Sequence, residues 1–306
     1  MSDILSLFSL QGKVAVVAGA SRGIGHAIAN GLVDAGARVV GFGRSDAAGD
    51  ARFDYRRCDV CAPAAVAGLF DDVEAEFGAI DVYLHVAGIT LPSQGGMQSS
   101  ETFNATLASN LSSAYDCCAN AGRRMAARGQ GSIITVTSIG SLMAFPNNPA
   151  YVAAKGGLRM MSKALALDLG PSQVRVNCLV PGYVQTAMTA ASHADPVLHE
   201  QRAGHTMLGR WGQPEDLVGA AIFLLRQPAN MSPAPTSSSM ADGLQKDCDE
   251  QHRIHAGTPG RSYRRQDPGL SLGYLATRVS ACPGAGPDGN GMDPGRRASG
   301  AEPLHH

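Results

Sequence analysis

The sequence predicts an α/β fold built on a doubly wound parallel sheet. Three observations predict it. Short β-branched runs alternate with helical stretches between residues 11 and 225, a glycine-rich turn joins the first run to the first helix, and the runs are continuously apolar. Continuously apolar strands are typical of parallel sheets covered by helices on both faces. We expect one domain over residues 1–225 and a separate tail over residues 226–306.

The expected elements follow one another as βα units, which predicts right-handed crossovers. Each strand is a short run dominated by Val, Ile, Leu, Phe or Tyr, and these runs fall at 14–17, 38–42, 81–84, 132–137 and 174–179. Each helix is longer and has apolar residues at helical spacing, at 24–35, 64–77, 101–128, 150–169 and 214–225.

Composition excludes several classes of protein. The 25 Lys and Arg balance 26 Asp and Glu, so the net charge of -1 gives no reason to expect nucleic acid or an anionic membrane as partner. No apolar run approaches the ~20 residues of a membrane helix, and the N-terminus does not resemble a secretory signal. The seven cysteines lack metal-ligand spacing, so we expect no metal, reduced thiols and a cytoplasmic location.

The turn after the first strand has the pattern of a dinucleotide-binding loop. It reads Gly19-Ala20-Ser21-Arg22-Gly23-Ile24-Gly25 and opens a helix. Glycines there permit a tight turn and a close approach of the backbone to a pyrophosphate on the helix N-terminus. An ordinary glycine-rich turn is the alternative.

The end of the second strand favours NADP over NAD. It reads Gly41-Phe42-Gly43-Arg44-Ser45, with no carboxylate before Asp46 to accept from the ribose hydroxyls. Arg44, assisted by Arg22, can instead pair with a 2′-phosphate. NAD remains possible if Arg44 is only a solvated turn residue.

Tyr151 and Lys155 are expected to share one face of a helix, because they stand four residues apart. A phenol has a pKa near 10, and a neighbouring ammonium favours its ionised form. Tyr151 could then exchange a proton with a substrate hydroxyl or carbonyl while a nicotinamide exchanges hydride. Ser138, at a strand end, would orient the same oxygen.

Together these residues resemble the short-chain dehydrogenase/reductase family in its single-domain form, over about residues 8–225. The resemblance implies a Rossmann fold, a small carbonyl or alcohol substrate, and usually a homotetramer. It implies that Asn110, Ser138, Tyr151 and Lys155 are the catalytic residues. In this family the asparagine holds a water for proton relay to the lysine. It also implies cofactor contacts from the loop residues, from Arg44, Tyr151 and Lys155, and from Asp59, Val60, Ala87, Gly88, Pro181, Gly182, Val184 and Thr186.

The chain departs from the family pattern at two places. Ala18 stands where the family usually has Thr, and His85-Val86-Ala87-Gly88 replaces Asn-Asn-Ala-Gly. The usual Asn side chains brace the backbone near the cofactor, so we expect weaker cofactor binding or lower stability. His85 has apolar neighbours, and we favour a packed residue over a new catalytic base.

Two stretches resemble gluconate 5-dehydrogenases and 2-deoxy-gluconate dehydrogenases, at residues 7–13 and 209–216. Similar stretches occur in 3-oxoacyl-carrier-protein reductases, which are the alternative. The segment 187–208 carries His193, His199, Arg202 and His205. These side chains could meet a carboxylate substrate, but we favour a solvated mobile lid.

The tail resembles coding sequence read in a shifted frame. About half of the 17 prolines lie in it, and only about seven of its roughly 81 residues are Leu, Ile, Val or Phe, too few for a core. Read one base earlier through permitted codons, residues 230–242 give His-Val-Thr-Gly-Thr-Asp-Ile-Phe-Val-Asp-Gly-Gly, the usual family ending. A stop codon becomes possible at the junction of Cys248 and Asp249.

We therefore expect a frameshift near Leu225, natural or from sequencing, and a sheet without its last strand. An exposed sheet edge would make the chain unstable or impair tetramer assembly. The alternative to an enzyme is an inactive nucleotide-binding protein. Arginines of the tail, such as Arg261, are not expected to form a nucleic-acid arm.

Overall fold

The computed structural model describes residues 4–225, and six strands in this part of the chain form one parallel sheet. The order is β3-β2-β1-β4-β5-β6, so the strand order reverses between β1 and β4. In such sheets ligands bind outside the carboxyl ends of the strands at this reversal. The strands are β1 (Val14–Ala18), β2 (Arg38–Gly43), β3 (Asp54–Arg57), β4 (Val82–His85), β5 (Gly131–Val136) and β6 (Val174–Leu179).

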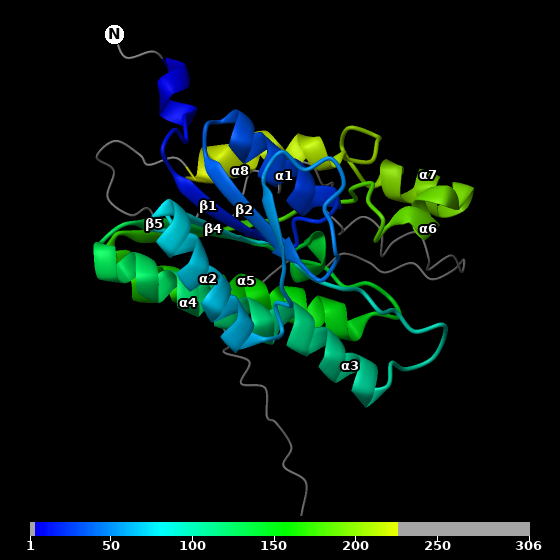
Figure 1. The fold of residues 1–306 in the computed structure, drawn as a ribbon. Coiled ribbons are helices and arrows are strands. Elements are labelled where there is room, and N and C mark those ends of the chain that lie inside the picture. Colours follow the sequence, from blue (N-terminus) through cyan, green and yellow to red (C-terminus); the bar gives the residue numbers. More distant parts are fainter. Residues whose placement is uncertain (1–3, 226–306) are drawn as a thin grey trace, which may run out of the picture. The chain divides into compact units, whose positions relative to one another are not determined.

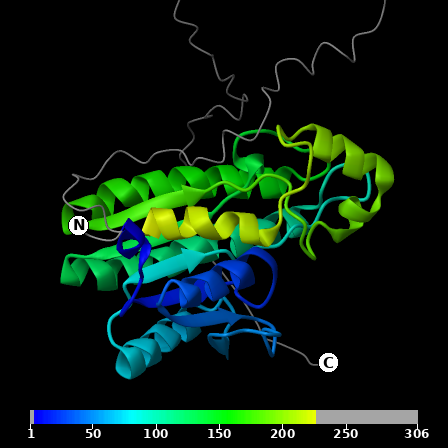
Figure 2. The same ribbon diagram turned by 90° about the horizontal axis from the view of Figure 1, so that it is seen from above.

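Helices cover both faces of the sheet, as the sequence predicts. One face carries α1 (Gly23–Asp34) and α8 (Val218–Leu225), and the other carries α2 (Pro63–Phe77), α4 (Ser113–Arg128) and α5 (Pro149–Leu169) (Figure 1). Figure 2 shows the same layers from above. The short helices α3 (Ser100–Leu107), α6 (Ala190–Ala194) and α7 (Pro196–Gly204) complete the α-helices of the described chain.

Alternation along the strands divides the core into two apolar clusters. Val16, Phe42 and Tyr83 face α2, α4 and α5, whereas Val17 and Leu84 face α1 and α8. All five side chains are fully buried. The doubly wound architecture is therefore confirmed.

Two elements differ from the expectation. β3 was not predicted, because its sequence Asp-Tyr-Arg-Arg is polar and forms the edge of the sheet. The single helix expected over 101–128 is wrong in its middle, where the π-helical turn Ala108–Ser112 separates α3 from α4. Widened turns of this kind are frequent at functional sites.

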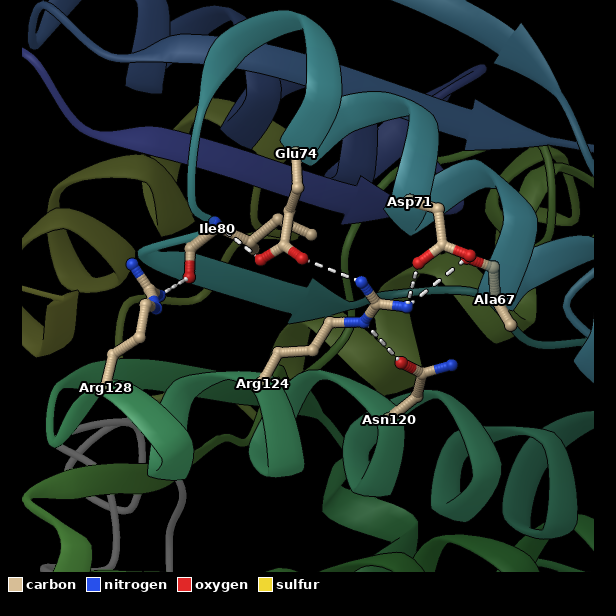
Figure 3. Close-up of polar contacts among 7 residues, drawn as sticks. All are labelled: Ala67, Asp71, Glu74, Ile80, Asn120, Arg124 and Arg128. Atoms are coloured by element: carbon tan, nitrogen blue, oxygen red, sulfur yellow. Dashed lines mark hydrogen bonds and ion pairs between the residues drawn. The ribbon is translucent and has the colours of Figure 1, made fainter.

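Arginines of α4 hold this helix against α2 and the start of β4 (Figure 3). The guanidinium of Arg124 donates to Glu74 at 2.7 Å and to Asp71 at 2.6 Å, and Arg128 donates to the carbonyl of Ile80. These contacts lie in the C-terminal half of α4, the helix that begins directly after the π-helical turn.

The expected boundary at residue 225, the irregular tail, the shifted frame and the missing last strand concern residues 226–306 and lie outside the described residues. Within residues 4–225, no helix combines the length and the apolarity needed to cross a bilayer.

Candidate active site

The loop after β1 fits tightly against the segment that follows β4. Gly19 has φ +83°, and a Cβ there would lie 2.6 Å from the backbone nitrogen of Ala87. A Cβ at Gly25 would lie 2.2 Å from the carbonyl oxygen of Gly19. Neither position accepts a side chain without movement of the backbone, so the glycines let this loop close on itself and against β4.

The N-terminus of α1 is suited to an anion. Its N-cap residue, Arg22, makes no side-chain capping hydrogen bond, and the first turn has no acidic residue. The first N–H groups of a helix and its dipole attract phosphate. The residues present therefore fit the pyrophosphate of a dinucleotide.

The end of β2 provides a free cation beside this loop. Arg44 lines the same cleft and makes no hydrogen bond or ion pair within residues 4–225. The nearby carboxylate of Asp46 is bound by Arg57 at 2.8 Å. Ser45 lies 3.4 Å from Ser21 between the two hydroxyl oxygens, which joins the end of β2 to the glycine loop. The guanidinium of Arg44 is thus available to an anionic group in the cleft.

A cleft of about 610 Å³ connects the glycine loop with the ends of β4, β5 and β6. Most of the predicted site residues line it: Gly19, Ser21, Arg22, Gly23, Ile24, Gly25, Arg44, Val60, Ala87, Gly88, Ser138, Tyr151, Lys155, Pro181, Gly182, Val184 and Thr186. The structure also brings in residues that the sequence reading missed: Gly43, Ser45, Cys58, Val86, Ile89, Thr90, Leu91, Ser109, Val136, Thr137, Ala187, Met188 and Thr189. Most of these are direct neighbours of predicted residues, and that adjacency was the available signal.

Two predicted residues do not line the cleft. Asp59 is exposed, and its carboxylate accepts from the backbone N–H of Cys61 at 3.0 Å in a short turn. Asn110 is fully buried in the π-helical turn. Its side chain accepts from the N–H of Ile89 and donates to the carbonyl of Ile89, both at 2.7 Å. Asn110 therefore braces the backbone beside the cleft.

Lys155 and Tyr151 lie together on α5, as predicted. The Lys155 Nζ atom is 5.8 Å from the Tyr151 ring centroid and donates to the carbonyl of Val136 at 2.9 Å. Burial lowers the pKa of Lys155 to about 8. Burial also raises the pKa of Tyr151, and a hydrogen bond with Ser138 acts in the opposite direction. The net pKa of Tyr151 lies above its usual value because burial outweighs the hydrogen bond with Ser138, and the effect of the Lys155 ammonium on the phenol stays a prediction.

The segment after β6 closes the other side of the cleft. The N–H of Ile139 donates to the carbonyl of Pro181 at 3.0 Å, which ties this segment to the turn that carries Ser138. A Cβ on Gly23 would lie 3.3 Å from the methyl carbon of Thr186. Thr186 thus lies directly against the glycine loop.

The four cationic or imidazole side chains of the segment 187–208 are half-buried, so they are less solvated than expected, and a mobile lid stays a prediction. His193 and His199 lie 4.6 Å apart between ring centroids, and both pack on the buried ring of Trp211. The guanidinium of Arg202 lies over the rings of Tyr183 and Trp211, at 5.4 and 5.8 Å. Helices α6 and α7 are thereby fixed to an aromatic cluster.

Comparisons with known proteins agree with this geometry. A family model described as enoyl-(acyl carrier protein) reductase matches residues 19–261. Gluconate 5-dehydrogenase of Gluconobacter oxydans (strain 621H) is 35% identical over 228 residues, which are 71% of this chain and 89% of that protein. The 3-oxoacyl-[acyl-carrier-protein] reductase FabG of Escherichia coli (strain K12) is 34% identical over 231 residues, 72% of this chain and 93% of that protein.

A solved structure of a gluconate 5-dehydrogenase is also similar to this chain. The gluconate 5-dehydrogenase of Burkholderia cenocepacia J2315, in complex with NADP and tartrate, superimposes with a TM-score of 0.70 at 35% identity. The match covers 73% of this chain and 92% of that one. The chain therefore belongs to the short-chain dehydrogenase/reductase family, the NAD(P)-dependent oxidoreductases that act on CH–OH groups.

Proposed function

We propose that this chain is an NADP-dependent dehydrogenase that interconverts a secondary alcohol and a ketone on a sugar acid resembling gluconate. The main support for the proposal is the composition of one cleft. A single cleft joins the glycine loop, the free guanidinium of Arg44, and the three polar side chains Ser138, Tyr151 and Lys155.

Each polar residue of the cleft has a separate role in the proposed reaction. A bound nicotinamide supplies or accepts the hydride. The hydroxyl of Tyr151 gives its proton to the carbonyl oxygen in reduction and takes it back in oxidation. Ser138 donates a hydrogen bond to the same oxygen and holds it in place. Lys155 carries its charge below pH about 8 and opposes the effect of burial on Tyr151.

Arg44 supports the preference for NADP. The guanidinium of Arg44, at the end of β2, has no hydrogen-bond or ion-pair partner among the described residues and can form a bidentate pair with a 2′-phosphate. The similar Burkholderia enzyme contains NADP, in line with this assignment. The choice of a sugar acid rests on the gluconate 5-dehydrogenases among the relatives.

A second function has comparable support. The FabG reductases are 34 to 35% identical to this chain, which is as close as the gluconate enzymes. The alternative is therefore reduction of a 3-oxoacyl thioester at the same Ser138, Tyr151 and Lys155. An inactive nucleotide-binding protein is the third possibility, in which the tail has removed activity but not cofactor binding.

Titration and a substrate panel separate the three. NADPH and NADH are titrated against the purified chain while thermal unfolding is followed, and gluconate-type acids and 3-oxoacyl thioesters are then tested. Stabilisation by NADPH with turnover of sugar acids supports the proposal. Turnover of thioesters alone supports the reductase, and stabilisation without turnover supports the inactive protein.

We also propose a cytoplasmic location and assembly into a homotetramer. All five cysteines within residues 4–225 are free thiols, which fits a reducing compartment. The tetramer rests on the family resemblance, and light scattering of the purified chain tests it: a mass near 31.6 kDa would exclude assembly.

A further inference from the structure

His85 is a buried group that the proposed reaction does not use. It ends β4, its side chain is 0% exposed, and in the sheet it lies opposite Thr135 of β5. Its Nδ1 atom is 2.9 Å from the hydroxyl oxygen of Tyr83. Its Nε2 atom is buried and has no hydrogen-bond partner among the described residues. A buried polar atom without a partner costs free energy and calls for an explanation.

The contacts of Tyr83 indicate which nitrogen of His85 carries the proton. The thiol of Cys117 donates to the carbonyl of Val60, and the Tyr83 hydroxyl forms a hydrogen bond with the Cys117 sulfur. If the phenol proton is directed to that sulfur, the phenol oxygen accepts from His85 Nδ1–H. The contact of one ring nitrogen sets the form of the other. Nε2 then presents a lone pair.

Lys155 lies on the same side of the sheet as His85. Its ammonium donates to Val136, the residue after the Thr135 that pairs with His85. A Cβ on Gly88, three residues after His85, would lie 3.6 Å from the Lys155 Nζ atom. Burial, and to a lesser extent the charge of Lys155, lowers the pKa of His85 to about 3. The imidazole is therefore neutral at working pH, and its unpartnered Nε2 can accept a hydrogen bond.

We propose that His85 is a positioning residue for Lys155, whose ammonium donates to the Nε2 lone pair through one buried water. Nε2 and the ammonium provide the two polar partners that such a water needs at minimum. An additional acceptor stabilises the charged lysine and directs it toward Tyr151. The consequence for Tyr151 rests on the proposed function, whereas the contact between His85 and Lys155 does not.

Other titratable groups in this region leave the charge of Lys155 dominant. Cys58, Cys117 and Cys118 interact with Tyr83, and burial raises the pKa of all three thiols. Tyr151 is a further titratable group near Lys155, and burial raises its pKa and keeps it protonated.

Two substitutions of His85 form a matched test. The Gln side chain places a polar atom near Nε2, whereas Asn reaches only the position of Nδ1. The chain contains four lysines, so its Lys155 signal can be followed by NMR after ¹³C-lysine labelling and assigned with Lys155→Met. We expect the pKa of Lys155 to fall by about one pH unit in His85→Asn and to stay within a few tenths in His85→Gln. Equal pKa values in both variants and in the unaltered chain would overturn the proposal.

The tautomer gives a second readout that needs no substrate. In the full chain labelled with ¹⁵N-histidine, we expect His85 as the Nδ1–H form without titration between pH 5.5 and 9. Tyr83→Phe removes the acceptor and should shift the ring toward Nε2–H. An Nε2–H form in the unaltered chain would contradict the assignment even if a variant failed to fold.

Activity then separates this proposal from the proposed function. With turnover, the alkaline limb of kcat for NADPH-dependent reduction should move down with the Lys155 pKa in His85→Asn, a loss of about tenfold above the limb and less than twofold at pH 6.5. A chain with the expected pKa and tautomer but no turnover of any substrate would refute the function and leave the His85–Lys155 contact supported.

Discussion

Replacement of Gly25 by alanine tests the glycine loop most directly. Gly25 lies in the first turn of α1, and a Cβ there would lie 2.2 Å from the oxygen and 2.8 Å from the carbon of the Gly19 carbonyl. Ordinary contacts of this kind are near 3.4 Å, so the loop backbone must move by about 1 Å. Overpacking costs about 1–3 kcal/mol, while alanine returns about 1 kcal/mol of helix propensity.

The net expectation for Gly25→Ala is a loss of up to about 2 kcal/mol of stability, together with a loss of cofactor affinity. For a domain of this size, 1 kcal/mol corresponds to about 2–4 °C in Tm. The displaced loop no longer presents its N–H groups to the pyrophosphate, so we expect the Kd for NADPH to rise at least about tenfold, or 1.4 kcal/mol. Fluorescence titration and thermal unfolding measure the two effects.

Gly68→Ala is the matched control. Gly68 lies inside α2, and a Cβ there would meet nothing within 4 Å. Alanine at that position should therefore be neutral or stabilise by about 0.5–1 kcal/mol, with unchanged NADPH binding. If Gly25→Ala bound NADPH within twofold of the unaltered chain and kept its Tm, the assignment of this loop to the pyrophosphate would be refuted.

Four further results are expected. Tyr151→Phe should lower kcat by about 10²-fold or more with a much smaller change in NADPH affinity, by steady-state kinetics and titration; a fully active variant would exclude Tyr151 as the acid. Arg44→Ala should raise KM for NADPH about tenfold or more and leave KM for NADH within twofold, whereas equal changes would remove the 2′-phosphate contact. Lys155→Met should abolish activity yet raise the free energy of unfolding at pH 7 by about 1–3 kcal/mol, because the pKa of Lys155 falls from 10.5 to about 8 on folding. The unfolded chain binds more protons between these values, so urea titrations should show that gain shrinking from pH 8 to 10.5; a constant gain would contradict the pKa. Finally, the coding DNA of residues 230–242, read one base earlier, should encode the usual family ending. A single codon incompatible with that ending would exclude the frameshift.

Apolar periodicity predicted five of the six strands and the layer arrangement, because buried parallel strands are continuously apolar. β3 was not predicted, and the reason is physical. At the sheet edge its residues are exposed or only half-buried, and Arg56 forms ion pairs with Asp54 and Glu76 instead of packing in the core. A polar strand of four residues has no apolar pattern to detect.

The site was predicted where motif and local geometry coincide. Helical spacing alone was enough to predict that Tyr151 and Lys155 share a face. A strand followed by a helix was enough to place the glycine loop. The position of Asn110 could not be predicted, because it depends on the π-helical turn at 108–112. This turn shifts the helix register, and no pattern in its sequence indicates it. The raised pKa of Tyr151 was not predicted, because spacing reveals a neighbouring charge but not the degree of burial.

Burial explains why activity and stability conflict at this site. Lys155 is 4% exposed and makes a single hydrogen bond within the described chain, to Val136. An ammonium in that position destabilises the folded state, yet the same desolvation strengthens its effect on a neighbouring phenol. The neutral imidazole of His85 is consistent with this balance, because a lone pair supports the charge without adding another. An imidazolium there would repel Lys155, and an aliphatic residue would leave the ammonium with fewer acceptors. The departure from the family's usual Asn is therefore compatible with a functional lysine.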